Sequence, residues 1–290
     1  MATMRDIKRR RNSISSTQQI TKAMKLVSTV KLQKARTRAE NSKAYFNCMY
    51  ETVTSMLSKA GNVQHPYLQA RAVKKIGVVV VTSNRGLAGG YNSNITKLIT
   101  GGDWKKEDVR IYAVGKKGAD SLSVKGYEVA QNYSEVIEEP TYSDAQRLGA
   151  QLLSDFENGE IDEIYLAYTV FKNTVSHIPT MMKLLPIDTN VEMEENKTDM
   201  NVVDTTPMNF EPDEEEVIGL LVPKYITSIL YGAFVEAVAS ENGARMAAMD
   251  NATNNADEMI SDLALKYNRA RQSAITQELT EIIAGAEAIS

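Results

Sequence analysis

The sequence is poor in the residues that carry most catalytic and metal chemistry. It has two histidines, His65 and His177, and a single cysteine, Cys48, in 290 residues, so no disulfide can form within the chain. Neither histidine has a cysteine or an acid at metal-ligand spacing, and no serine–histidine–aspartate arrangement is present. We therefore expect no catalytic residue, no metal and no cofactor, and we interpret Cys48 as a packing residue within a helix.

Long apolar runs are also missing. Runs such as residues 76–81 and 217–222 are far shorter than the roughly 20 residues that cross a bilayer, so we expect membrane association only through partners. The net charge of -4 shows no bias towards nucleic acid. The first sixteen residues are rich in arginine and serine, as transit peptides are, but they lack a small-residue cleavage site and run unbroken into a helical pattern. We assign them to the mature fold.

Helix breakers are absent from the start of the chain. Residues 1–59 contain neither proline nor glycine, which predicts one helix over residues 3–59, about 85 Å long at 1.5 Å per residue. Such a helix needs a partner along its length to cover an apolar stripe. Its apolar residues recur at helical spacing: Ile7, Ile14, Ile20, Met24, Val27 and Val30.

The end of the chain supplies the partner. Asp213 and Glu216 form a predicted capping box, and a helical pattern of about 70 residues follows, to Ile283. Gly232 and Gly243 each cost about 1 kcal/mol in a helix interior. The predicted seam consists of Leu221, Tyr225, Ile229, Ala233, Ala237, Ala244, Ala248, Met259, Leu263, Tyr267, Ala270 and Ala274. Pairing the two long helices as an antiparallel coiled coil is the simplest way to bury both stripes.

The middle of the chain changes period and alternates between strands and helices. Its predicted strands are residues 76–81, 109–114, 127–132, 163–171 and 177–185, and Ser143 with Gln146 is a candidate capping box for the helix that ends near Phe156. This alternation indicates an α/β domain with a parallel-type sheet. The expected fold is therefore a Rossmann-like α/β domain from which the coiled coil projects. The expected domains are residues 1–60, 73–212 (with an acidic excursion over 188–212) and 213–290.

A glycine-rich loop, residues 82–92, lies between a strand and a helix, where α/β folds bind phosphate. Its spacing fits neither the dinucleotide fingerprint nor a Walker loop, so we favour a tight turn that needs glycine for a positive φ. A nucleotide-binding α/β protein stays open as an alternative.

Charge is unevenly distributed along the chain. Residues 1–39 carry eleven basic side chains against Asp6 alone, whereas residues 192–216 are strongly acidic. The basic helix could bind nucleic acid, an acidic membrane surface or a protein with acidic loops, and a coiled-coil adaptor stays open as a second alternative. The C-terminus is apolar, with Ile282, Ile283 and Ile289, which suggests a partner socket at the end of the rod.

Three segments resemble the gamma subunit of bacterial F-type rotary ATP synthases. Residues 20–27 (ITKAMKLV) are similar to its first-helix segment, residues 84–92 (NRGLAGGYN) to its central-domain loop, and residues 267–286 (YNRARQSAITQELTEIIAGA) to its C-terminal signature. The resemblance covers the whole chain in the right order. It implies the central rotor shaft of a proton- or sodium-translocating ATP synthase, a non-catalytic subunit on the cytoplasmic face of the plasma membrane.

The resemblance also implies partners and contact residues. The shaft would sit in a ring of three alpha and three beta subunits, and its foot would bind the epsilon subunit and the membrane c-ring. The residues implied to meet the beta subunits are Met24, Lys25, Arg271, Gln272 and Thr276. The regulatory cysteine pair of chloroplast members is absent from this chain.

Overall fold

The computed structural model describes residues 3–59, 65–174, 176–187, 210–211 and 213–287, and it divides the chain into two compact units. One unit consists of residues 1–30 and 245–290 and the other of residues 31–244. Two helices contribute to both units, α1 (Met4–Lys59) and α5 (Glu214–Glu287). The two uninterrupted helices expected from the sequence are confirmed, whereas most of the acidic excursion lies outside the described residues.

The larger unit contains a five-stranded sheet within the described residues, in the order β3-β2-β1-β4-β5. Its strands are β1 (Ile76–Val81), β2 (Val109–Val114), β3 (Glu128–Asn132), β4 (Glu163–Phe171) and β5 (His177–Leu185). The first four strands are parallel, as the alternation of strands and helices predicts. β1 is buried at every position, because both faces of the central strand are covered.

β5 departs from the parallel pattern expected from the sequence, because it runs antiparallel to β4. Only five residues, 172–176, join the two strands. A parallel neighbour would need a crossover of a dozen residues or more, so a connection this short permits only a hairpin. The predicted strand over residues 177–185 is confirmed, and the length of the connection shows why it does not share the parallel sense of the other four strands.

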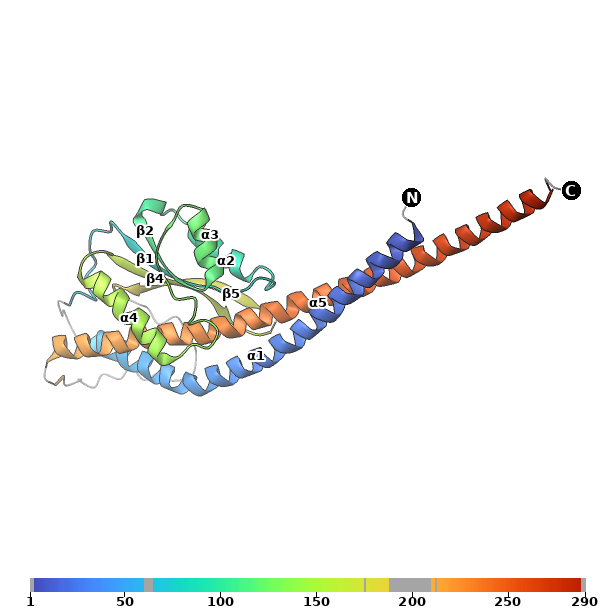
Figure 1. Ribbon diagram of the computed structural model, residues 1–290. Helices are drawn as coiled ribbons and strands as arrows, with labels where there is room; N and C mark the ends of the chain where they lie inside the picture. Colours follow the sequence, from blue (N-terminus) through green and yellow to red (C-terminus); the bar gives the residue numbers. More distant parts are fainter. Residues whose placement is uncertain (1–2, 60–64, 175, 188–209, 212, 288–290) are drawn as a thin grey trace. The chain divides into compact units, whose positions relative to one another are not determined.

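Helices cover both faces of the sheet (Figure 1). α2 (Tyr91–Thr100) and α3 (Lys116–Val124) pack on one face, around Val78, Val80 and Ile111. α4 (Tyr142–Glu157) and the parts of α1 and α5 in this unit pack on the other, around Val79 and Val81. A single 3-10 turn, Lys106–Asp108, precedes β2. The long helices therefore supply one wall of the α/β core.

The start of α5 is anchored in this core. An 18-residue window of the helix is apolar enough to cross a membrane by length and composition, with a mean hydropathy of 1.5, although it is no uninterrupted run. Half of that window is buried, with Ile218, Val222 and Phe234 fully inside the larger hydrophobic cluster. A core helix passes the same test of composition, and burial against the sheet explains the apolar sequence of this part of α5.

Two helix starts test the capping predictions. Asp213 caps α5, since its Oδ1 accepts a hydrogen bond from the Glu216 backbone N–H at 2.9 Å, as expected. The capping box of α4 is formed by Thr141 and Asp144 and not by Ser143 and Gln146, so that prediction was wrong by two residues. The Thr141 backbone N–H and hydroxyl both donate to the Asp144 carboxylate, which binds more tightly than the neutral amide of Gln146 would.

Gly243 has a packing role that its sequence context does not show. A Cβ at this position would lie 2.5 Å from Nε2 of His177, so the imidazole occupies the space that a side chain would need. Burial lowers the pKa of His177, which keeps the ring neutral against the helix. Cys48, by contrast, is exposed, so the packing role that we expected for it was wrong.

We predict that Gly243→Ala destabilises the chain by about 1–3 kcal/mol, because the new methyl group must displace the His177 ring. Gly219→Ala in the same helix is the matched control, since its Cβ would lie 3.6 Å from the nearest atom, an ordinary contact. The control should be neutral or stabilising by about 1 kcal/mol. Urea unfolding followed by circular dichroism compares the two variants, and equal stability of both would contradict this packing.

Candidate partner interface of the coiled coil

The smaller unit is an antiparallel pair of helix segments. Thr21 lies against Thr253, and Lys25, further along α1, lies against Asp250, earlier along α5. Among the buried or half-buried positions of α1 in this unit, eight follow one another in steps of three and four: Met4, Ile7, Arg11, Ile14, Gln18, Thr21, Lys25 and Ser28. Eight positions of α5 follow the same rule: Met249, Thr253, Ala256, Ile260, Leu263, Tyr267, Ala270 and Ala274. This is the heptad spacing of a coiled coil, so the expected pairing of the two ends is confirmed.

The seam itself differs from the predicted stripe. Ile7 and Ile14 lie in it as expected, but Ile20, Val27 and Val30 face outwards with 58–60% of their surface exposed. On α5, the predicted Met259 is exposed, and Ala256 and Ile260 occupy the seam in its place. A search for apolar residues cannot find this seam, because five of its eight α1 positions are polar.

The polar seam positions are paired across the two helices. Lys25 Nζ lies 2.5 Å from Asp250 Oδ1, and the hydroxyl oxygens of Thr21 and Thr253 are 2.8 Å apart. The Gln18 amide donates to the Asp257 carboxylate. Towards the N-terminus, the Arg11 guanidinium lies over the ring of Tyr267, 5.9 Å from its centroid. Polar groups therefore satisfy one another at these seam positions, while Ile20, Val27 and Val30 stay outside the seam.

These outward apolar residues form a second stripe. Ile20, Ala23, Val27 and Val30 are all exposed and are separated by three, four and three residues, so they share one face of α1. Single exposed apolar residues are common, but a continuous stripe at heptad spacing with no cover within its own unit indicates contact with another chain. We call these four residues the outer stripe.

The end of α5 is a second exposed apolar region. Ile275, Leu279, Ile282 and Ile283 lie on one face of the helix, and each is 48–68% exposed. Arg271, Gln272 and Thr276 are exposed in the same turns. Within the smaller unit, this end of α5 extends beyond the start of α1 (Figure 1), and Ile289 lies outside the described residues. A helix of this length is marginal in water when it has no neighbour, so its apolar face also calls for a partner.

The expected beta-contact residues of α1 lie differently from the outer stripe. Met24 and Lys25 are half-buried, and the Lys25 ammonium is bound to Asp250 at the seam. The exposed side chains of this segment include the outer stripe, of which the sequence reading had assigned Ile20, Val27 and Val30 to the interior. The exposure of the outer stripe could not be predicted from the sequence. It depends on which heptad positions form the seam, and the polar pairs across the two helices determine this.

The glycine-rich loop is closed by its own side chains. The Asn92 carboxamide oxygen accepts from the Ser83 backbone N–H at 2.9 Å, and Asn84 bonds both Lys116 N and Ser134 O. Gly89 has φ 56°, which confirms the tight turn, and Leu87 adopts φ 63° without being a glycine. The asparagine side chains thus hold the loop to itself, to the Ser134 carbonyl oxygen and to the backbone N–H at the start of α3.

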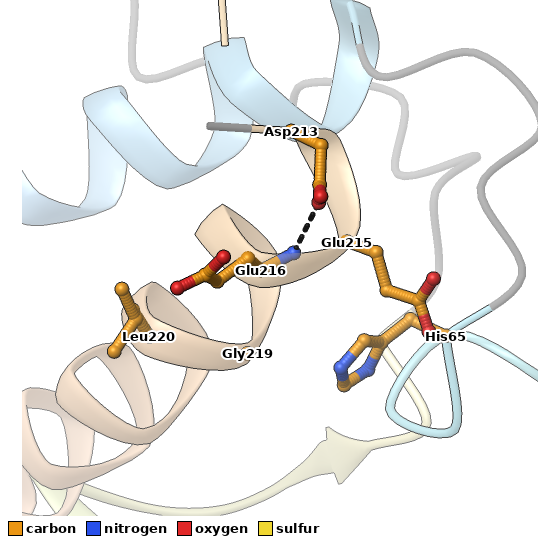
Figure 2. A pocket seen from close by; sticks show the side chains of 6 residues that line it. All are labelled: His65, Asp213, Glu215, Glu216, Gly219 and Leu220. Atoms are coloured by element: carbon orange, nitrogen blue, oxygen red, sulfur yellow. Dashed lines mark hydrogen bonds between the residues drawn. The ribbon is translucent and has the colours of Figure 1, made fainter. Parts of the chain in front are cut away.

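A pocket of about 410 Å³ lies at the start of α5, lined by His65 and the acids Asp213, Glu215 and Glu216 (Figure 2). Asp213 is already used as the helix cap, and burial lowers the pKa of His65 in spite of its acidic neighbours. Among the described residues, no group of three or more histidine, cysteine and acidic side chains could hold a metal ion. We therefore interpret the pocket as part of the capped start of α5.

Comparison with known proteins decides the family. The ATP synthase family model matches residues 3–289. The ATP synthase gamma chain of Lachnoclostridium phytofermentans is 61% identical over 291 residues, with full coverage of both chains. The sodium ion specific ATP synthase gamma chain of Acetobacterium woodii is 41% identical over 99% of each. This chain belongs to the ATP synthase gamma-chain family.

Solved structures agree with the gamma-chain fold. A chain of the central stalk and c-ring of the Tetrahymena thermophila mitochondrial ATP synthase superimposes with a TM-score of 0.59 at 25% identity, over 80% of this chain and 99% of that one. A chain of the Euglena gracilis mitochondrial enzyme gives 0.72 at 19% identity, over 99% and 94%. As a gamma chain, this protein has the central-stalk role in a rotary ATP synthase and is part of the membrane-associated complex.

The outer stripe can be tested by one polar substitution in the gamma chain. Val27→Ser should change the free energy of unfolding of the chain by less than about 0.5 kcal/mol, because the side chain is 58% exposed. It should weaken the assembled synthase, measured as recovery of intact complex and its ATP turnover. Thr29→Ser is the control, since it keeps the hydroxyl bond to the Lys25 carbonyl oxygen. Strong destabilisation of the isolated chain, or normal assembly and turnover, would contradict the assignment.

Proposed function

We propose that this chain transmits torque as a non-catalytic shaft inside a ring of three alpha and three beta subunits. Its foot binds the epsilon subunit and the c-ring, and the complex lies on the cytoplasmic face of the plasma membrane. One observation carries the proposal: the smaller unit pairs several polar side chains at its seam and leaves the outer stripe and the apolar face at the end of α5 exposed. Contiguous exposed apolar surface of this kind marks a site of contact with another protein.

The outer stripe supports a close-fitting partner around the rod. Burial of an exposed valine or isoleucine side chain stabilises an interface by about 1.5–3 kcal/mol when it is complete. The stripe has four members on one face of α1, and the end of α5 adds four larger apolar side chains. A ring of subunits that contacts the rod at both places would cover both regions. The contact at the end of α5 would be the partner socket for Ile282, Ile283 and Ile289.

Charge supports beta subunits with acidic loops as the neighbours. The first turns of α1 expose Arg5, Lys8, Arg9 and Arg10 against one acid, Asp6, which is paired with Arg9 at 3.7 Å. Such a basic surface attracts acidic loops and fixes the orientation of docking, and it weakens as salt screens it. Electrostatic push and steric contact need no catalytic group, in keeping with a shaft.

A single rod in a ring of three identical sites presents a different side to each. The side with the outer stripe is apolar, whereas other sides carry lysine and arginine. A partner site changes its conformation only when its contacts differ in free energy between two states. Rotation of an asymmetric rod supplies such differences in turn, so each beta subunit would pass through a cycle of nucleotide affinities.

The nucleotide-binding alternative receives less support from the fold. The glycine-rich loop is filled by the side chains of Asn84 and Asn92, and Tyr91 at the start of α2 donates to the Ala237 carbonyl oxygen of α5 at 3.2 Å. The loop thereby fastens α2 to the long helix. This is a structural use of the residues that would otherwise meet a phosphate.

The contact residues near the end of α5 have a direct test. Arg271→Ala and Gln272→Ala should each lower ATP turnover of the assembled complex at least about fivefold, the size expected for loss of about 1 kcal/mol of contact. Both side chains are exposed, so the circular dichroism spectrum and melting of the chain should not change. Ser273→Ala, an exposed neighbour, serves as the control. Normal turnover in both variants would remove the assignment of this contact.

A further inference from the structure

The middle of the coiled-coil seam holds few groups that could fix one alignment of the helices by apolar packing. Thr21 and Ser28 are buried there with 8% and 2% of their surface exposed, and Thr253 lies opposite. Nearby seam positions of α5 are occupied by alanine, such as Ala256. Small, similar side chains allow one helix to slide along the other with little change in packing, so another interaction must set the register.

Three polar pairs are arranged in an antiparallel series. Along α1 they involve Gln18, Thr21 and Lys25, one turn apart, and along α5 they involve Asp257, Thr253 and Asp250 in the opposite direction. Each member has a partner of matching chemistry: an amide with a carboxylate, a hydroxyl with a hydroxyl, and an ammonium with a carboxylate. All three pairs are satisfied together in one register.

A slip of one turn would break the whole series. If α5 moved by about one turn, Lys25 would face Thr253 or the Met246–Ala247 turn and Asp250 would face Thr21 or Ser28. The ammonium and the carboxylate would then lose each other, and the two threonine hydroxyls would keep only the bonds to carbonyl oxygens of their own helices. Single polar residues in coiled-coil seams select register in this way, because the misaligned pairing leaves polar groups unmatched.

We propose that the Lys25–Asp250 ion pair, seated beside the Thr21–Thr253 hydroxyl pair, is a register lock that holds α1 and α5 in alignment while torque acts on the rod. Torque on two helices wound about each other pushes one along the other, which is the movement that the lock opposes. The lock also fixes the side of the rod on which the outer stripe lies. If α1 slid along α5, it would also rotate about its own axis to keep its seam residues against α5. This inference rests on the proposed shaft function.

The pair acts on alignment more than on overall stability. The side chains of Lys25 and Asp250 are 39% and 45% exposed, and an ion pair so accessible to water adds little to the free energy of unfolding. Its effect is a preference for one register over the neighbouring ones. The proposal therefore needs a measurement of the register of α1 against α5 and a measurement of how ion transport is coupled to ATP hydrolysis. A melting temperature reports overall stability and does not test it.

Alignment is measured by a disulfide between Thr21→Cys and Thr253→Cys in a Cys48→Ala background. The two hydroxyl oxygens are 2.8 Å apart, so cysteines at these positions meet in the native register. The ion pair is then varied: Lys25→Asp, Asp250→Lys, and both changes together. We expect each single charge reversal to lower the disulfide yield about threefold, as for loss of a half-exposed pair, and the double reversal to restore it. Lys22→Asp, an exposed charge reversal on the same helix, should leave the yield unchanged.

Coupling is measured as ion transport per ATP hydrolysed by the assembled complex in vesicles, with the same charge reversals in the chain that retains both threonines. We expect the single reversals to lower this ratio and the double reversal to recover it. The lock is refuted if the single reversals leave disulfide yield and coupling unchanged, if the double variant is as impaired as the single ones, or if alignment is lost while coupling stays normal. The disulfide yield of the isolated chain depends on no partner, so it is independent of the Arg271 and Gln272 contact.

Discussion

The pairing of two helix segments that lie more than two hundred residues apart in the sequence is the constraint on which the rest of this structure depends. It needs a continuous helix at each end of the chain, and both ends have one: α1 is free of proline and glycine, and α5 continues through Pro223, close to its start. It also needs seam residues at matching heptad positions in both helices, and in α1 many of these residues are polar. With these residues in the seam, the outer stripe lies outside it, and the rod has an apolar surface.

α5 serves two environments along one helix. Its first part is a wall of the α/β core, where Ile218, Val222 and Phe234 are buried against the sheet. Its later part carries the alanine-rich seam of the coiled coil. Because a helix transmits displacement along its length through a continuous set of backbone hydrogen bonds, one element with both roles gives a direct mechanical link between the residues of the two units. Gly243, packed against His177, lies one residue before the end of the larger unit at Ala244.

Sequence reasoning predicted the elements better than their surroundings. The two long helices were evident from the missing breakers, and β1 from its continuous run of valines, because these signals are local. The parallel strands followed from the alternation of elements. The sense of β5 did not follow from that alternation, because it depends on the five-residue connection before the strand, which is too short for a crossover. The cap of α4 was misplaced because two overlapping residue pairs fit the same capping pattern.

The candidate interface was the hardest part to foresee. Periodicity arguments assume that apolar residues face the interior, and the segment around Ile20 and Val27 reverses that assumption. Only the side-chain pairs, such as Lys25 with Asp250, reveal which face of α1 lies inside. Hydrophobic pattern alone therefore places these residues on the wrong side of the helix.

The most direct test of the account is to observe whether this chain rotates. Cys48 is the only cysteine of the chain and is exposed, so a fluorescent probe can be attached there without a new substitution. In a synthase whose alpha and beta subunits are fixed to a surface, ATP hydrolysis should drive the probe in one direction, at a rate that follows turnover. Hydrolysis at the normal rate with a probe that stays still, or that reorients at random, would contradict the account.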